Sequence, residues 1–125
     1  MYTVTVKRDF IAQHYLIGGD WGDENEPHAH HYVVEVRLEG RTLDDHGYLT
    51  DICEIESTLD EQVARYRDAM LNELPEFKGL NPSIEHFARF LNQRIAENIQ
   101  THHLRAMAVR LWENEWAWAQ YREEF

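Results

Sequence analysis

"YTVTVKRDFIAQH", residues 2–14, alternates between apolar and polar side chains over most of its length. A period of two residues is that of a β-strand with one buried face. The stretch therefore predicts a long strand, and its parity puts His14, the last residue, on the buried face. The other residues expected on that face are Tyr2, Val4, Val6, Phe10 and Ala12.

A second alternating run begins at His30, after a loop at residues 16–27 that contains three glycines and a proline. Residues 40–47 after this run have the composition of a turn region. Because a single loop joins the two runs, they are expected to form an antiparallel pair of strands. The apolar residues that share one face of the second strand are Tyr32, Val34, Val36 and Leu38.

Two helices are expected after the second strand. Asp51 is a cap-type residue, and apolar residues follow it at helical spacing as far as Met70. After an intervening loop, Asn81 and Pro82 combine a cap side chain with a proline at the first helical position. The apolar stripe that follows predicts a second helix that extends to about residue 100.

Two more strands are expected near residues 104–112 and 116–123, which completes the order strand, strand, helix, helix, strand, strand. This order predicts an α+β fold, with a four-stranded antiparallel sheet and two helices on one face. Trp116 and Trp118 fall near the more polar face, which favours contact of that face with another subunit. The length predicts one domain spanning residues 1–125.

Composition and charge argue against several classes of partner. A net charge of −11, from 23 acidic and 12 basic residues, is unfavourable for binding nucleic acid or an anionic membrane surface. The single cysteine, Cys53, excludes an internal disulfide. No apolar stretch is long enough for a signal peptide or a membrane span, which predicts a cytoplasmic protein.

The segment "ENEPHAHHY", residues 24–32, contains three histidines within four positions. In an extended chain His28 and His30 project to the same side, while His31 points to the other side. If the two strands form a hairpin, His14 meets His28 and His30, and the three imidazoles provide a zinc site with a fourth position free. A histidine-rich surface loop without metal is the alternative, and the spacing alone leaves both interpretations open.

Four short motifs follow one another along the chain: "FIAQH" (10–14), "HAHHY" (28–32), "NPSIE" (81–85) and "VRLWE" (109–113). In this order they resemble the 6-pyruvoyl-tetrahydropterin synthase family, which includes the bacterial 6-carboxy-tetrahydropterin synthases. That family shows F-x-A-x-H, H-G-H-x-Y, N-P-T-x-E and a strand that ends in glutamate. The resemblance covers nearly the whole chain, and the four motifs in order are more specific than any one of them alone.

The resemblance implies the tunnelling fold, in which three subunits close a barrel and two trimers stack into a homohexamer with active sites at subunit interfaces. It also implies that His14, His28 and His30 bind zinc and that the substrate is a small-molecule pterin. Glu113 matches the carboxylate that holds the pterin ring, and Glu85 of the third motif joins it in the substrate-binding set. A carboxylate pairs bidentately with an aminopyrimidinone edge. Without the resemblance, a charge at the end of a strand is the simpler interpretation of Glu113.

The sequence departs from the family at the residues expected to transfer protons. Glu24 stands in place of the family's catalytic cysteine, and Arg67 and Asp68 stand in place of its Asp-His pair. A branch of the family that carries a glutamate near the metal is associated with cleavage of the side chain. Glu24 and Glu26 are therefore the candidate bases, and Asp68 would need a partner residue from elsewhere. A solvated acidic loop is the alternative for both glutamates, and Cys53 is expected to be a packed or idle thiol.

Three functional hypotheses follow from these residues. The first is a zinc-dependent lyase acting on the side chain of dihydroneopterin or its triphosphate, with zinc as a Lewis acid that acidifies the side-chain hydroxyls. The second is a zinc- and pterin-binding paralogue that has lost the family reaction, or that cleaves the side chain to 6-hydroxymethyl-dihydropterin. The third is an oligomeric structural domain with incidental histidines.

Overall fold

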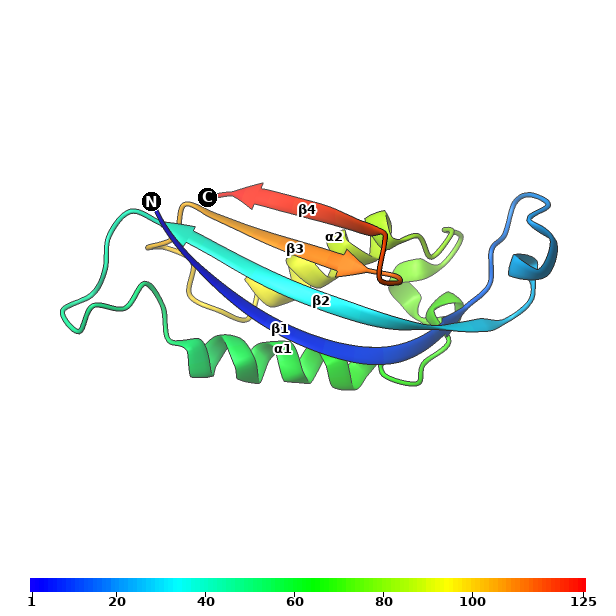
Figure 1. The fold of residues 1–125 in the computed structure, drawn as a ribbon, viewed down its shortest axis with the longest axis horizontal. Coiled ribbons are helices and arrows are strands. Elements are labelled where there is room, and N and C mark those ends of the chain that lie inside the picture. Colours follow the sequence, from blue (N-terminus) through cyan, green and yellow to red (C-terminus); the bar gives the residue numbers. More distant parts are fainter.

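The computed structural model describes all residues from 1 to 125 and contains one antiparallel sheet covered on one face by two helices (Figure 1). The strands lie in the order β1-β2-β3-β4. This arrangement confirms the predicted α+β fold. The strands are β1 (Tyr2–His14), β2 (His28–Gly40), β3 (Ala106–Trp112) and β4 (Trp118–Glu124), and the helices are α1 (Ile52–Tyr66) and α2 (Ile84–Ala96).

β1 and β2 form one long hairpin whose register runs from Tyr2 opposite Gly40 to His14 opposite His28. β2 begins two residues before the expected start at His30, because the ladder extends to the last pair of the hairpin. The parity predicted for β1 is confirmed, since residues at even positions face the helices. Those that are buried are Val6, Phe10, Ala12 and His14.

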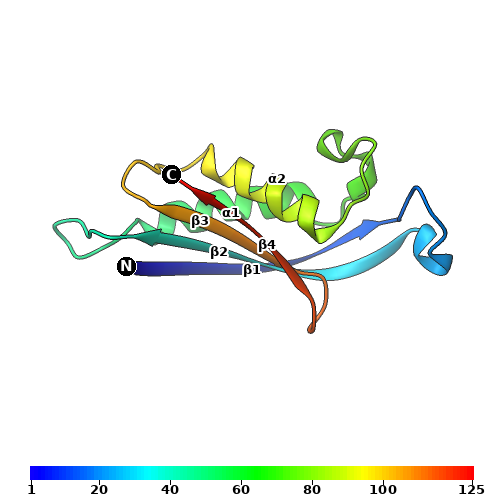
Figure 2. The same cartoon turned by 90° about the horizontal axis from the view of Figure 1, so that it is seen from above.

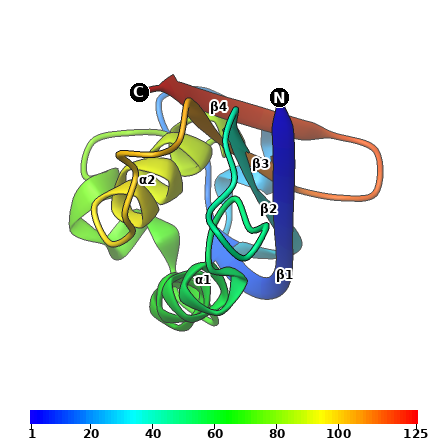
Figure 3. The same cartoon turned by 90° about the vertical axis from the view of Figure 1, so that its left-hand side faces the viewer.

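Both helices lie on the same side of the sheet, with α1 against β1 and α2 against β3 and β4 (Figures 2 and 3). Phe87 of α2 occupies the centre of the core and is fully buried. Its ring centroid lies within 5.9 Å of four other aromatic rings, in edge-on arrangements that aromatic pairs favour. These rings are contributed by both helical and strand segments, namely Phe10, Tyr32, Tyr66 and Phe77.

The start of α1 agrees with the prediction and the start of α2 does not. Asp51 caps α1 by accepting a hydrogen bond from the backbone N–H of Cys53. Ser83 caps α2 by accepting from the N–H of His86, so the prediction of Asn81 as the cap is wrong. The Asn81 side chain instead accepts a hydrogen bond from the N–H of Ile17 at 2.8 Å. Asn81 therefore anchors the loop after β1 to the loop before α2.

Both helices end earlier than the apolar stripes indicate. α1 ends at Tyr66, and Met70 lies beyond it in a short bridge to Gln13 of β1. α2 ends at Ala96, and turns and bends occupy most of the segment between it and β3. Three short 3₁₀-helices complete the chain, η1 (Gly22–Asn25), η2 (Leu71–Glu73) and η3 (Pro75–Phe77). Neither α-helix is long and apolar enough to cross a membrane.

β1 and β4 are the two edges of the sheet. The end of β1 is partly covered, since the N–H of Asp68 donates to the Ile11 carbonyl at 2.7 Å and the N–H of Gln13 donates to the Ala69 carbonyl at 2.8 Å. The remaining edge groups have no partner strand within the chain. An open sheet with two such edges is consistent with a barrel that closes when several chains associate.

The sheet face opposite the helices carries charged and aromatic side chains. The guanidinium of Arg110 lies 3.8 Å from the ring centroid of Trp118, a cation–π contact. β4 begins at Trp118 rather than at residue 116, because the Asn114 side chain accepts hydrogen bonds from the N–H groups of Trp116 and Ala117 and closes a turn. Trp116 is consequently 86% exposed at the tip of the β3–β4 hairpin.

Candidate metal centre

Three histidines meet at the end of the β1–β2 hairpin. The strand register pairs His14 with His28, and the pleat of β2 projects His30 to the same side. The three ring centroids are separated by 4.5, 4.8 and 5.0 Å, and one ligand atom from each residue lies within 4.8 Å of the others. His31 projects to the opposite face, where it contacts Asp9 at 2.6 Å. The structure thus brings together the three histidines that the sequence predicts, and leaves His31 apart.

Backbone carbonyls orient two of the three imidazoles. The Nδ1 atom of His14 lies 3.2 Å from the carbonyl oxygen of Pro82, and that of His28 lies 2.8 Å from the carbonyl oxygen of Glu26. A carbonyl oxygen only accepts, so the proton of each neutral ring is assigned to Nδ1 and the lone pair to Nε2. The two Nε2 atoms lie 2.9 Å apart. Two facing lone pairs at this distance repel each other, and a cation between them would be bound by both.

Burial keeps His14 in the form that binds metals. Its side chain is 2% exposed, and burial, together with the charges of His30 and His28, lowers the pKa of His14 to about 4. The imidazole is therefore neutral at neutral pH, as a metal ligand must be. Tyr32 lies 3.2 Å from Nδ1 of His14, and burial raises the pKa of the Tyr32 hydroxyl, which stays protonated.

The donor set fits zinc. Three imidazoles, two of them oriented by hydrogen bonds from the second ring nitrogen, are a common arrangement in catalytic zinc sites. Such a site leaves one coordination position for another ligand. The side of the cluster next to the end of β3 is occupied by the carboxylate of Glu113.

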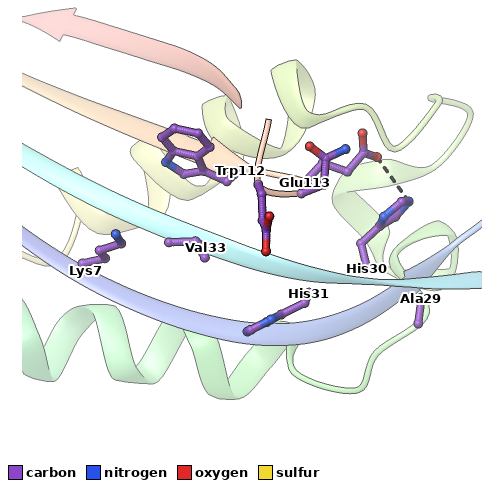
Figure 4. A pocket seen from close by; sticks show the side chains of 9 residues that line it. Lys7, Ala29, His30, His31, Val33, Trp112 and Glu113 are labelled. Carbon is purple, nitrogen blue, oxygen red and sulfur yellow. Dashed lines mark ion pairs between the residues drawn. The ribbon is translucent and has the colours of Figure 1, made fainter. Parts of the chain in front are cut away.

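Glu113 follows the last residue of β3 and contacts the histidine cluster directly. Its Oε1 atom lies 3.4 Å from Nε2 of His30 and 3.8 Å from Nε2 of His14. The contact with His30 is drawn as a dashed line in Figure 4. The family resemblance implies a role for Glu113 in holding a ring but does not predict this contact with the histidines. The contact depends on the pairing of β2 with β3, which brings the end of β3 beside the β1–β2 hairpin.

A hollow of about 650 Å³ lies beside Glu113 (Figure 4). The backbone N–H of Glu113 donates to the Ala117 carbonyl at 3.1 Å, which fixes its main chain, while its side chain is 29% exposed. The carboxylate thus contacts the histidine cluster and also borders the hollow, as His30 does. The other residues that line the hollow are Lys7, Ala29, His30, His31, Val33, Trp112, Asn114 and Glu115.

Glu24 and Glu26 lie in and just after η1, and both side chains are exposed. Neither carboxylate belongs to the cluster of potential metal ligands. Both residues act through their main chain instead: the Glu24 carbonyl accepts from the N–H of Leu16 at 2.9 Å, and the Glu26 carbonyl faces His28. The structure of one chain therefore leaves the side chains of both candidate bases in solvent.

Asp68, Glu85 and Cys53 lie outside the histidine cluster, and all three are exposed. Asp68 adopts a φ of 60° beside the edge strand β1, where its N–H binds the Ile11 carbonyl. Glu85 is in the first turn of α2, and Cys53 is in the first turn of α1. A single chain does not bring Asp68 or Glu85 to the metal centre, so any role there depends on another subunit.

Comparisons with known proteins agree with these observations. A family model described as 6-pyruvoyl tetrahydropterin synthase matches residues 3–124. A protein of Archaeoglobus fulgidus, provisionally named 6-carboxy-5,6,7,8-tetrahydropterin synthase, is 30% identical over 95 residues, which cover 76% of this chain and 75% of that protein. The 6-pyruvoyl tetrahydrobiopterin synthase of Dictyostelium discoideum is 33% identical over 66 residues, which cover 51% of this chain and 49% of that protein. This chain therefore matches about half the length of the Dictyostelium relative.

A solved structure of Plasmodium vivax 6-pyruvoyltetrahydropterin synthase has a TM-score of 0.82 against this chain. That protein is described as a catalytic-residue mutant in which alanine replaces glutamate. The identity is 15%, and the match covers 99% of this chain and 98% of that chain. At this identity the likeness concerns the fold alone, and it confirms the tunnelling fold that the resemblance implies.

Proposed function

The chain belongs to the 6-pyruvoyl tetrahydropterin synthase family, and on that premise we propose that it is a zinc-dependent lyase acting on the side chain of a dihydroneopterin-type substrate. The observation that carries the proposal is the cluster of His14, His28 and His30, with its two facing Nε2 atoms 2.9 Å apart. Bound to these residues, zinc supplies Lewis-acid chemistry that acidifies the hydroxyl groups of the substrate side chain.

Glu113 is the residue proposed to hold the pterin ring. Its carboxylate accepts two parallel hydrogen bonds from the 2-amino and N3 groups of an aminopyrimidinone. The hollow beside it, at about 650 Å³, falls in the range of small-molecule sites. Because Glu113 also lies next to His30, a ring held by this carboxylate has its side chain near the histidine cluster. Glu85 is proposed to join the substrate-binding set from a neighbouring subunit.

Glu24 is the proposed base that moves protons on the substrate side chain, and Glu26 is the alternative in the same loop. A carboxylate can accept a proton from an acidified hydroxyl within hydrogen-bond reach. The Plasmodium vivax relative, in which a glutamate is described as a catalytic residue, supports a carboxylate in this role. Asp68 is proposed to assist from the edge of a neighbouring chain, because it lies beside β1, where subunits would meet.

We propose that the active form is a homohexamer built from two trimers. The two free edges of the sheet, β1 and β4, supply the surfaces through which three chains would close a barrel. The face that carries Arg110 and Trp118 would then line the inside of the barrel. In such an assembly, the exposed carboxylates of Glu24 and Asp68 lie near chain edges, where a neighbour completes the site.

A second candidate function is that of a zinc- and pterin-binding protein that has lost the family reaction, or that releases 6-hydroxymethyl-dihydropterin. The observation in its favour is that the carboxylates of Glu24 and Glu26 lie in solvent, outside the metal cluster. The two candidates share the metal and ring contacts and differ in the residues that transfer protons.

Incubation of zinc-loaded protein with dihydroneopterin and with its triphosphate, followed by mass spectrometry of the products, separates the two candidates. The proposed lyase converts one of the two substrates, loses turnover in Glu24→Gln and keeps it in Cys53→Ala. Tight binding of the pterin without any product favours the second candidate. Absence of both binding and product with zinc-loaded protein contradicts the proposed function.

A further inference from the structure

We propose that the carboxylate of Glu113 occupies the fourth coordination position of the metal in the substrate-free protein, and that binding of the pterin ring draws it away. The second half of this proposal rests on the proposed function, since it takes Glu113 as the ring-binding residue. Glu113 then makes an open metal position available only when a ring with the correct hydrogen-bonding edge is bound.

One distance between Glu113 and the histidines matches that between two ligands of one metal ion. For tetrahedral zinc with bonds of about 2.0–2.1 Å, neighbouring donor atoms are about 3.3–3.4 Å apart. Oε1 of Glu113 lies 3.4 Å from Nε2 of His30 and 3.8 Å from Nε2 of His14. The 3.4 Å separation is that of two donors on one ion, whereas the 3.8 Å separation is longer. Glu113 lies outside the group of mutually close donor atoms formed by His14, His28 and His30, so its side chain would have to move towards them to bind as a fourth ligand. Carboxylate oxygen is also an ordinary zinc ligand.

The same carboxylate cannot serve the metal and the ring equally well. A bidentate contact with an aminopyrimidinone needs both carboxylate oxygens. The main chain of Glu113 is fixed by its bond to Ala117, so its side chain reaches the histidines on one side and the hollow on the other. Glu115, the other carboxylate at the hollow, is exposed, whereas Glu113 is paired with His30 and His14. Metal and ring therefore compete for Glu113 alone.

Competition for one side chain has a reciprocal thermodynamic consequence. If binding of a ring removes a ligand from the metal, the metal must weaken binding of the ring by the same factor. A site with four protein ligands is also closed to other donors, as in structural zinc sites. The substrate-free protein is then coordinatively closed, and a molecule without the aminopyrimidinone edge does not open it.

Zinc affinity, measured by competition with a chelating dye, tests the first half of the proposal. Glu113→Gln is expected to bind zinc about tenfold or more weakly than the wild type, the range found when groups supporting a metal site are lost. Glu113→Asp keeps the charge but shortens the side chain by one methylene, so it is expected to weaken zinc binding to a similar extent. Glu115→Gln, the matched control, is expected to bind zinc like the wild type. Wild-type affinity in either Glu113 variant overturns ligation by Glu113.

Binding of unsubstituted pterin to the wild type, followed by fluorescence with and without zinc, tests the second half. Unsubstituted pterin has the aminopyrimidinone edge but no side-chain hydroxyls that could replace Glu113 at the metal. Zinc is expected to weaken its affinity several-fold. Equal or tighter binding in the presence of zinc overturns the displacement of Glu113. If pterin binds neither form while the Glu113 variants lose zinc, ligation by Glu113 is supported, and both its displacement and the proposed function are overturned.

Discussion

Nε2 of His14 and Nε2 of His28 lie 2.9 Å apart, while Nδ1 of each ring faces a backbone carbonyl oxygen. The carbonyls assign the ring protons to Nδ1, so the close pair of nitrogens consists of two hydrogen-bond acceptors. Two facing lone pairs at this separation repel each other, and a cation bound by both removes this repulsion. The geometry of the hairpin end therefore favours a bound cation, independently of any comparison with other proteins.

The first prediction concerns the metal ligands. His28→Ala is expected to reduce the zinc content of the purified protein from about one ion per subunit to a small fraction, because two imidazoles bind zinc much more weakly than three. Elemental analysis after dialysis measures the stoichiometry. His31→Ala is the matched control, since its ring lies on the opposite face and contacts Asp9, and it is expected to retain zinc. Full zinc content in His28→Ala contradicts the ligand set.

The second prediction concerns the stability of the metal-free protein at mildly acidic pH. Burial, with the charges of His30 and His28, lowers the pKa of His14 from 6.5 to about 4. The unfolded chain thus binds more protons than the folded one in this interval, and stability rises with pH. The contribution of neutral His14 to the free energy of unfolding is fully present above pH 6.5. It is lost as the pH falls towards 4. We expect the free energy of unfolding to fall by about 2 kcal/mol over this range.

Urea unfolding of metal-free wild type and His14→Gln across this interval measures the effect. The variant lacks the titrating group, so its stability is expected to depend less on pH between 6.5 and 4. A wild-type protein and a variant that lose stability in parallel would show that another group is responsible.

The elements predicted best from sequence are those set by local periodicity. The alternation of β1 fixes which side His14 faces, and the i, i+2 rule fixes His28 and His30, so the meeting of these three histidines follows from the strand pattern. That they bind a metal is implied by the family resemblance and not by the pattern. The contact of Glu113 with His30 depends on the register between β2 and β3, which are separated by both helices in the chain. No local pattern encodes that register, so the contact between Glu113 and His30 cannot be predicted from the sequence.

The loop residues show a second limit of sequence reasoning. Asn81 and Ser83 are both good helix caps, and which one is used depends on the Ile17 N–H, a group 64 residues away that takes the Asn81 side chain. The contacts of Glu24 are equally hard to predict from sequence, because they depend on the conformation of the loop. In the structure its carbonyl accepts a hydrogen bond from the N–H of Leu16, while its carboxylate is exposed. Its carboxylate is exposed in a single chain, and its proposed role in catalysis stays a prediction.

The third prediction separates the two cap-type residues. Ser83→Ala removes the acceptor for the His86 N–H at the start of α2 and is expected to lower the free energy of unfolding by about 1 kcal/mol. Ser83→Asp restores an acceptor at the cap and is expected to recover most of that loss. Asn81→Ala instead leaves the Ile17 N–H without its partner, so increased amide hydrogen exchange is expected at Ile17. Slow exchange at Ile17 in Asn81→Ala would contradict the anchoring role of this side chain.

The fourth prediction concerns a polar network that joins α1 to the segment before α2. The Glu76 carboxylate accepts hydrogen bonds from the Tyr66 hydroxyl at 2.6 Å and from Arg65 at 2.7 Å. Burial opposes ionisation of Glu76, but the hydrogen bonds from Arg65 and Tyr66 outweigh it and lower its pKa from 4.5 to about 2. A depressed carboxylate pKa stabilises the folded state fully above pH 4.5, and this stabilisation is lost as the pH falls towards 2.

Glu76→Gln keeps the shape of the side chain but removes the charge that Arg65 and Tyr66 donate to. We expect the free energy of unfolding of the variant to be about 2 kcal/mol lower than that of the wild type at neutral pH. Hydrogen bonds to charged groups are stronger than those between neutral groups. The difference from the wild type should shrink as the pH falls from 4.5 towards 2, since the unfolded wild-type chain then binds a proton at Glu76 while the folded carboxylate is still charged. Glu73→Gln, at an exposed position without side-chain partners, is the control and should leave stability nearly unchanged. If the difference in free energy of unfolding between Glu76→Gln and the wild type stays constant down to pH 2, then packing, rather than the charge of Glu76, accounts for the lower stability of the variant.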